Sequence, residues 1–593
     1  MGQAGAAPDD PSGFRQGECP ARKGTDETMD AGVSSEGLKV GWRKRLAAAF
    51  VGGCLVFLAF PRFDIAPLAW VALVPTLWAA RGFGLRGRFL IGWFAGTVTN
   101  IGGFYWIYGL LQNFGHMSPL PSALLTVLLA AYQGVRFGIA WLLLGILENR
   151  IRLFANWWAL PLAYLPVEFF FPIIFPWYFA NSQHWVIPFI QVVELGGVSL
   201  LGGLILAVNG AIFDLVERGM RLRRLEWRLV ALVVGIPLVL AVYGVVRMAQ
   251  VDSVVAGAEK LHVGMVEADV GIWEKEDPRK VDDNLVRHQR LSAGLARKGV
   301  DLVVWPETAY LPPRVYARRK GRSSPGWFRL VPRDAARLPP SPVPPPLHAA
   351  EDRRRAVPLE HRVAPQRGFS TPLLTGALTY ARNPANDSPR HRGIDIFNSA
   401  VLLDENGNVT GITDKVYLLL FGEHVPLGHT FPVLYEWFPE AGDLTAGDRL
   451  QILRFRNWRL AVMICYEDIL PRFTLEVAGQ RPHVLVNLTN DAWFGKTAEP
   501  YLHLALAVFR TVENRLAMVR STNTGVSAFI DPVGRVVAQT SLDGAETLDW
   551  RVPMMQGRTV YQLLGDWPVW ISVAAWLVMV IAAAVRRKTS SGG

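Results

Sequence analysis

Cysteine is scarce in this chain: its 593 residues include only Cys19, Cys54 and Cys465. Neither a paired-cysteine motif nor a His-x-x-x-His spacing occurs, and there is no Walker-type glycine loop for a nucleotide phosphate. These are the patterns that metal and nucleotide sites usually need. We therefore expect no metal ion and no other cofactor.

Charged residues are also few, at 19% of the chain, whereas 51% of the residues are hydrophobic. This balance is too apolar for a single soluble domain. The net charge of +11 is typical of nucleic-acid binding in a soluble protein. Here, however, the Lys and Arg residues cluster beside apolar segments, as membrane topology requires. We therefore expect a lipid bilayer as a partner and no nucleic acid.

Eight apolar stretches approach the ~20 residues that a helix needs to cross a bilayer. The first two are short and are separated by only four residues, which is consistent with a tight hairpin of imperfect spans. The predicted spans are 46–60, 65–80, 89–111, 123–147, 157–174, 192–216, 229–246 and 567–585.

Basic loops alternate along the chain with loops that carry almost no charge. Because positive residues mark the cytoplasmic side, both termini are predicted to be cytoplasmic. The ~300 residues between the seventh and eighth spans are then outside. Cys465 lies in this outer region, whereas Cys19 and Cys54 do not, so Cys465 has no disulfide partner.

The predicted organisation has four parts. Residues 1–41 form a polar, disordered leader, residues 42–248 a membrane bundle of about seven spans, residues 259–555 the outer domain, and residues 563–588 the final span and tail. In the outer domain, short apolar runs alternate with helical stretches, which predicts an α/β sandwich of sheets and helices.

An Arg- and Pro-rich stretch at 311–368 interrupts the outer domain and is predicted to be a largely unstructured insertion. Two interpretations stay open: a solvated loop without function, or a basic segment that touches anionic lipid head groups. Three charged residues inside predicted spans, Arg136, Glu168 and Glu194, also have two interpretations. They form intramembrane ion pairs, or they bind a polar head group.

Cys465 lies between an apolar run, Val462-Met463-Ile464, and the acidic pair Glu467-Asp468. It is either an inert core cysteine or a nucleophile. A nucleophilic thiol reacts as the thiolate and needs a base or a cation beside it. Glu307, which follows a buried strand, is suited to take the thiol proton. Lys415 is suited to stabilise the thiolate and an oxyanion.

In this order, Glu307, Lys415 and Cys465 resemble the Glu-Lys-Cys triad of the nitrilase superfamily of carbon–nitrogen hydrolases. The matching sequence segments are Trp305-Pro306-Glu307, Asp414-Lys415 with Phe421-Gly422-Glu423, Cys465-Tyr466-Glu467 and Asn490-Asp491-Ala492-Trp493-Phe494. With the membrane part included, residues 42–588 are similar to the apolipoprotein N-acyltransferases, which complete bacterial lipoprotein maturation. The resemblance implies a membrane bundle plus an α-β-β-α nitrilase-like domain on the periplasmic side of the bacterial inner membrane.

The resemblance also implies a reaction. Cys465 takes an acyl chain from a phospholipid as a thioester and passes it to the N-terminal amine of a diacylglyceryl-cysteine lipoprotein. Glu307 is then the base and Lys415 the oxyanion stabiliser, while Glu423 and Glu467 support the site. Tyr466 and Trp273 match aromatic positions beside the substrate path, although ordinary packing is the alternative explanation for both, and for Trp273 it is nearly as good.

A thioester of this kind must be kept from water, and the apolar run 416–421 is either a lid for that purpose or an ordinary strand. The chain departs from the family where Val266-Glu267-Ala268-Asp269 replaces a Gln-x-Asn pattern, and where Leu419-Leu420 replaces Val-Pro. Two other functions compete: a membrane-anchored amidase with the same triad in an open, wet pocket, and a transporter or scaffold. The latter predicts that Glu307, Lys415 and Cys465 lie far apart.

Overall fold

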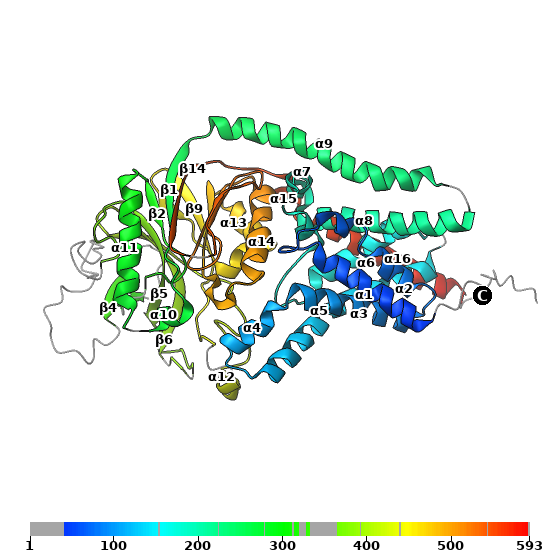
Figure 1. The fold of residues 1–593 in the computed structure, drawn as a ribbon, viewed down its shortest axis with the longest axis horizontal. Helices are drawn as coiled ribbons and strands as arrows, with labels where there is room; N and C mark the ends of the chain where they lie inside the picture. Colours follow the sequence, from blue (N-terminus) through cyan, green and yellow to red (C-terminus); the bar gives the residue numbers. More distant parts are fainter. Residues whose placement is uncertain are drawn as a thin grey trace, which may run out of the picture. The chain divides into compact units, whose positions relative to one another are not determined.

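The computed structural model describes residues 41–151, 154–222, 225–277, 279–310, 314–318, 328–332, 364–388, 390–391, 393–437, 441–542 and 544–590. The predicted leader and most of the Arg/Pro-rich stretch lie outside these residues. The amino-terminal part is helical up to residue 257, and one further long helix ends the chain (Figure 1). These helices are α1 (Trp42–Leu58), α2 (Val74–Ala80), α3 (Leu85–Gly103), α4 (Trp106–Asn113), α5 (Pro119–Arg150), α6 (Asn156–Phe170), α7 (Ile187–Ile190), α8 (Val193–Leu222), α9 (Trp227–Gly257) and α16 (Trp567–Ser590).

Among the described residues, three helices are long and apolar enough to cross a membrane: α5, α8 and α9. Two predicted spans are wrong as continuous helices. The 65–80 stretch is a 3₁₀ turn, Ala66–Trp70, followed by the short helix α2. Each of these two helices has a proline in its first turn. Proline has no N–H to donate, which is tolerated at the start of a helix but not inside one, so the second proline begins a new helix. The 89–111 stretch is broken between α3 and α4 at Phe104 and Tyr105.

Close approach of backbones holds α3 against α5. A Cβ atom on Gly96 would lie 2.8 Å from the carbonyl oxygen of Gly134, and one on Gly134 would lie 2.7 Å from the backbone nitrogen of Thr97. Both positions therefore require glycine. Small residues of this kind let apolar helices pack tightly where no hydrophobic drive from water acts between them.

The remainder of the chain forms two mixed β-sheets. The first contains β1 (Lys260–Glu267), β2 (Leu302–Val304), β3 (Arg314–Arg318), β4 (Phe328–Pro332), β5 (Leu373–Arg382), β6 (Ile394–Leu403), β7 (Val409–Asp414) and β14 (Glu546–Pro553). The second runs in the order β13 (Val536–Gln539), β12 (Ala528–Ile530), β11 (Met518–Thr522), β10 (Val484–Thr489), β9 (Trp458–Ile464) and β8 (Leu453–Phe455).

The two sheets pack face to face through a buried apolar core to which strands of both contribute, for example Met265, Leu374, Val462 and Val486. Helix α11 (Val281–Arg297) covers the outer face of the first sheet, and α14 (Glu499–Asn514) and α13 (Pro471–Gly479) lie beside the second (Figure 1). The predicted α-β-β-α layering is therefore confirmed. The strands are continuously apolar because both faces of each sheet are covered.

The predicted insertion is not wholly unstructured. Strands β3 and β4 pair with each other as an antiparallel hairpin, and β3 also pairs with β5. Those ten residues extend the first sheet at its edge, within a stretch predicted to be largely unstructured. The Pro-rich run at 339–346 and the triple arginine at 353–355 lie outside the described residues.

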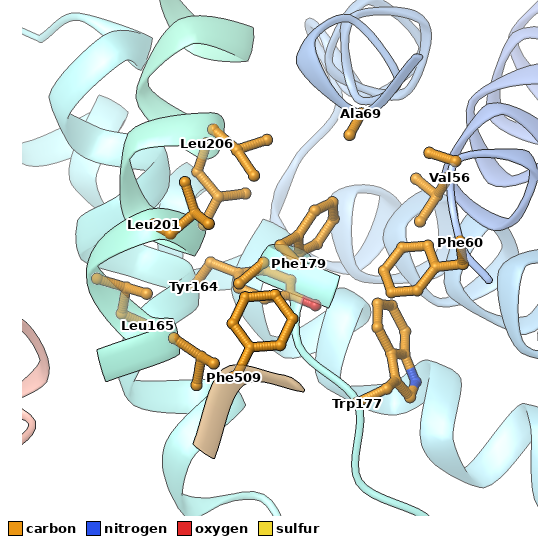
Figure 2. Packing of buried hydrophobic residues seen from close by; sticks show 14 of the residues in the cluster. Val56, Phe60, Ala69, Tyr164, Leu165, Trp177, Phe179, Leu201, Leu206 and Phe509 are labelled. Carbon is orange, nitrogen blue, oxygen red and sulfur yellow. The ribbon is translucent and has the colours of Figure 1, made fainter. Parts of the chain in front are cut away.

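Helix α14 also packs against the helical bundle. Phe509 points from α14 into a cluster of buried side chains that includes Tyr164, Leu165 and Leu201 (Figure 2). Beside this cluster, Glu194 of α8 accepts hydrogen bonds from Arg515 Nε at 2.7 Å and from Arg247 Nε at 2.6 Å. One of the three charges predicted inside spans is thus shown to be an ion pair, and it joins α8, α9 and the residue that ends α14.

Replacing Glu194 with Ala is expected to destabilise the protein by about 3–5 kcal/mol, because it leaves the buried Arg515 guanidinium without its counter-charge. Thermal unfolding of the purified protein in detergent measures this. Lys298→Gln, which breaks an exposed ion pair with Asp549, is the matched control and should cost about 0–1 kcal/mol. Equal effects of the two substitutions would contradict the structural importance of the buried pair.

Candidate active site

Three strand ends bring the predicted triad together. Glu307 follows β2, Lys415 directly follows β7, and Cys465 directly follows β9. The Lys415 ammonium lies 3.4 Å from Glu307 Oε1 and 2.7 Å from Glu423 Oε2. Lys415 is only 1% exposed and Glu307 6%, whereas Cys465 is half-buried. Residues more than 100 positions apart thus form one buried charge cluster, which contradicts the scaffold interpretation.

The backbone at Cys465 is left-handed, with φ of 51°. A residue with a side chain rarely adopts this conformation, and it marks sharp turns at functional sites. Here the chain leaves β9 and enters a 3₁₀ turn, Cys465–Ile469, so the side chain is presented at the end of the strand. An inert core cysteine would be fully buried, whereas the Cys465 side chain is half-buried and lies at a sharp turn.

Charge sets the protonation of the triad. Burial raises the pKa of Glu307, although the Lys415 ammonium opposes the rise. Burial alone lowers the pKa of Lys415, but Glu423, Cys465 and Glu307 together raise it well above its usual value. Burial and the Glu307 carboxylate raise the pKa of the Cys465 thiol well above its usual value, while Lys415 lowers it. The resting site therefore holds a neutral thiol beside a buried base and a permanent cation.

Glu467 ties the cysteine turn to the lysine segment. Its Oε2 accepts a hydrogen bond from Ile464 N at 2.8 Å, and its Oε1 accepts from Val416 N at 2.6 Å and Tyr417 N at 3.1 Å. Burial raises the pKa of Glu467 to about 7, although these backbone donors lower it. This carboxylate fixes the backbone on both sides of the site.

Asn398 and Gly376 belong to the site but were missed in the sequence. The Asn398 amide donates to Glu307 Oε1 at 2.6 Å and to Glu423 Oε1 at 2.8 Å, so it holds both carboxylates that face Lys415. A Cβ atom on Gly376 would lie 2.4 Å from Thr308 N and 2.6 Å from Glu307 Cα. Only glycine lets β5 pass this close to Glu307. Neither residue lies in a distinctive motif, so only the contacts identify them.

Behind Cys465 lies a buried charge network. The Asn487 amide donates to the Cys465 carbonyl oxygen at 3.1 Å, and Arg520 donates to Asn487 Oδ1 at 2.9 Å. Arg520 also pairs with Asp468 at 2.9 Å and with Asp491 at 3.0 Å. This network anchors the strained cysteine turn to the parallel strands β10 and β11.

Asp491, Glu499 and His503 are spaced closely enough to hold a metal ion, with ligand atoms within 4.8 Å of one another. In the described structure, the His503 ring pairs with the other two side chains and with Asp468. Both ring nitrogens of His503 face carboxylates, Asp468 at 2.8 Å and Asp491 at 3.1 Å. Although burial lowers the pKa of His503, these two carboxylates raise it to about 10. A protonated imidazole donates from both ring nitrogens, so His503 bridges Asp468 and Asp491.

The two aromatic candidates lie in different surroundings. Tyr466 is half-buried and donates from its hydroxyl to the Ile174 carbonyl oxygen at 3.3 Å, which links the cysteine turn to the loop after α6. Trp273, on the short helix α10 (Ile272–Glu276), is 51% exposed and its ring faces His116 at 5.3 Å. Lys275 on the same helix donates to the Glu307 carbonyl oxygen at 3.1 Å. The structure thus joins α10 to the triad through Lys275.

The apolar run 416–421 is not a strand, so that alternative was wrong. It is irregular, and Tyr417, Leu420 and Phe421 are 40–45% exposed. Leu427, 65% exposed, lies shortly after it. Exposed apolar side chains beside the buried charge cluster suit a site that meets lipid.

The two-sheet sandwich with Glu, Lys and Cys at its strand ends is that of a carbon–nitrogen hydrolase, and residues 277–560 match the family model described as "Carbon-nitrogen hydrolase". Residues 52–211 match the "Apolipoprotein N-acyltransferase N-terminal domain". The chain belongs to the apolipoprotein N-acyltransferase family.

Three relatives support this assignment over nearly the whole chain. The apolipoprotein N-acyltransferase of Geobacter metallireducens is 30% identical over 559 residues, covering 92% of this chain and 96% of the relative. That of Azotobacter vinelandii is 31% identical over 556 residues, with the same coverage of both chains. That of Rhodopseudomonas palustris is 26% identical over 595 residues, covering 96% of this chain and all of the relative.

Glu267, where the sequence departs from the family pattern, yields a pH-dependent prediction. Its Oε2 accepts hydrogen bonds from Ser527 and Thr540, each at 2.6 Å. Burial raises its pKa to about 7, although these donors lower it. The folded state therefore holds a proton that the unfolded state releases near pH 4.3, so stability falls as the pH rises from about 4.5 to 7.

Glu267→Gln should remove this fall. We expect the mutant to gain about 2 kcal/mol of unfolding free energy relative to the wild type between pH 5 and pH 7.5. Thermal unfolding at a series of pH values measures the difference. Glu405→Gln, on an exposed turn, should follow the wild-type curve. Parallel curves for wild type and Glu267→Gln would show that the pKa of this carboxyl is not raised in the folded protein.

Proposed function

We propose that this protein is an enzyme that acylates the N-terminal amine of diacylglyceryl-cysteine lipoproteins, with a membrane phospholipid as the acyl donor. The observation that carries this proposal is the buried Glu423–Lys415–Glu307 cluster beside the half-buried Cys465, in a chain of the apolipoprotein N-acyltransferase family. Glu307, Lys415 and Cys465 are its proposed catalytic residues.

In the first step, the Cys465 sulfur attacks the ester carbonyl of the phospholipid as the thiol proton passes to Glu307. The carbonyl oxygen becomes an oxyanion, which the Lys415 ammonium stabilises. When the C–O bond breaks, Glu307 returns the proton to the departing alcohol. The products are a thioester on Cys465 and a lysophospholipid.

In the second step, the neutral α-amine of the lipoprotein attacks the thioester carbonyl. A second oxyanion forms beside Lys415, the C–S bond breaks, and the amine proton returns to the sulfur through Glu307. An amide replaces the thioester and the thiol is restored. Glu423 holds Lys415 in place, and Glu467 and Tyr466 hold the turn that carries Cys465.

The thioester must survive until the amine arrives, so water must be excluded. The exposed apolar residues of 416–421 and Trp273 are proposed to line the lipid path to Cys465. The alternation of charged loops supports an inner-membrane protein with cytoplasmic termini and a periplasmic catalytic domain at 259–555. The bundle at 42–248 and the final span at 563–588 then deliver both lipid substrates to one surface.

An amidase that hydrolyses small amides uses the same triad. Two observations favour the transferase instead: the match of residues 52–211 to the transferase-specific domain, and the exposed apolar run next to Lys415. A single anchor would suffice for hydrolysis of a soluble amide.

The direct test supplies the purified protein with a phospholipid and a synthetic diacylated lipopeptide. We expect an N-acylated lipopeptide and one lysophospholipid per transfer. Cys465→Ala should give neither product, because it removes the thiol that is proposed to carry the acyl chain. Release of free fatty acid without acylated lipopeptide would favour a hydrolase, and full transfer by Cys465→Ala would remove the nucleophile.

Glu307 gives a second prediction. Because burial raises its pKa above the ordinary value of 4.5, the rate of thioester formation should rise with pH until Glu307 is ionised, and then level off. Glu307→Gln should slow thioester formation by about 10²–10⁴-fold, as followed by rapid-quench detection of the acyl-enzyme. Glu476→Gln, an exposed change on α13, is the control. Wild-type acylation by Glu307→Gln would show that another group is the base.

A further inference from the structure

Lys275, on the short helix α10, brings a second cation to Glu307. Its ammonium donates to the Glu307 carbonyl oxygen at 3.1 Å and to the Thr308 hydroxyl oxygen, and its side chain is partly buried. The proposed base therefore has one cation at its own main chain, in addition to the Lys415 ammonium at its carboxylate.

The turn that receives these hydrogen bonds is strained. Thr308 has a φ of 45°, a left-handed conformation that a β-branched residue rarely adopts. From β5, Gly376 N donates to the Pro306 carbonyl oxygen at 3.1 Å. The contacts of Lys275 come from α10 instead, so two separate elements hold the short turn that carries Glu307.

Helix α10 is also anchored independently of Lys275. The Glu274 carboxylate accepts a hydrogen bond from Arg287 Nη2 at 3.0 Å, and the Glu274 carbonyl oxygen accepts one from the Asn284 amide at 3.3 Å. Both partners lie on α11. We therefore expect a change at Lys275 to leave α10 in place and to remove the link to Glu307.

The charges around Glu307 balance only when Lys275 is counted. The groups that face Glu307 are Lys415, Glu423, Cys465, Lys275 and the Asn398 amide. Burial raises the pKa of Glu307 and Glu423 raises it further, whereas the two lysines and the Asn398 hydrogen bond lower it. Lys415 pairs with Glu423 at 2.7 Å as well as with Glu307, so one lysine serves two carboxylates. A second cation therefore favours the ionised form of the base.

We propose that Lys275 is a positioning residue for the base: from α10 it places a cation against the turn that carries Glu307 and so keeps the Glu307 carboxylate ionised. Lys275 acts through Glu307, and this role rests on the proposed function, in which Glu307 takes the thiol proton. Only the ionised carboxylate can accept that proton. Without Lys275, a smaller fraction of the enzyme is ready to form the thioester at a given pH.

The test follows thioester formation on the full-length protein by rapid quench, with saturating phospholipid, over a series of pH values. Lys275→Met and Lys275→Gln remove the charge. Both should move the midpoint of the rise in rate upward by about one pH unit, because a nearby opposite charge lowers the pKa of a carboxyl by that order. Below the wild-type midpoint, the rate should then be about tenfold lower. Lys275→Arg keeps the charge and should keep the wild-type midpoint.

Two controls assign the effect. Lys280→Gln removes an exposed lysine that lies between α10 and α11, and it should not move the midpoint. In a Glu307→Gln background, Lys275→Met should produce no shift, which separates an effect on the base from an effect on the thiol of Cys465. Partial loss of folded protein lowers the rate by the same factor at every pH and therefore does not move the midpoint.

Three results would overturn the role of Lys275 while leaving the proposed function intact. They are a wild-type midpoint in both Lys275→Met and Lys275→Gln, a shift in Lys275→Arg as large as that in Lys275→Met, and a shift that persists without Glu307. A wild-type protein that transfers no acyl chain and forms no thioester would instead overturn the proposed function and the role of Lys275 together.

Discussion

The ammonium of Lys415, buried between the carboxylates of Glu307 and Glu423, is the interaction on which the site depends. A buried cation is costly unless it is paired, and here two carboxylates and the amide of Asn398 complete the pairing. The same cation serves the proposed chemistry. It opposes protonation of Glu307 and lowers the cost of ionising Cys465, and in the proposed mechanism it remains charged where an oxyanion forms. Both the packing of the site and the proposed mechanism therefore depend on the positive charge of Lys415.

Other buried charges join parts of the chain that are far apart in sequence. Arg520 and Asn487 connect the turn at Cys465 to neighbouring strands, and Glu194 connects two helices of the bundle to Arg515 after α14. These contacts are stronger than those on the surface because Arg520, Glu194 and Arg515 are withdrawn from water. The proposed reaction between two lipids needs the turn at Cys465 held firmly next to the helical bundle, and these pairs connect the two.

The sequence predicted the layers of the fold and half of the described strands, because apolar runs are local signals. The family resemblance implied that Glu307 and Lys415 lie together. The sequence did not reveal Asn398 or Gly376, whose importance comes from contacts with Glu307 across the sheet. It overestimated the helices at 65–80 and 89–111, because hydropathy does not register the prolines and the break at Phe104 that interrupt them. It missed the hairpin of β3 and β4, because an Arg- and Pro-rich composition obscures short strands that pair at a sheet edge. The orientation of the bundle, and the roles of Tyr466 and Trp273, stay predictions.

The central claim is that Cys465 carries an acyl chain covalently between two lipids. Mass spectrometry of the peptide that contains Cys465, after the purified protein meets a phospholipid of known chain length, tests this directly. The peptide mass should rise by one acyl group, and the added mass should disappear when a diacylated lipopeptide is supplied. Transfer of the acyl chain to the lipopeptide while the Cys465 peptide never gains mass, even under rapid quenching, would contradict the account.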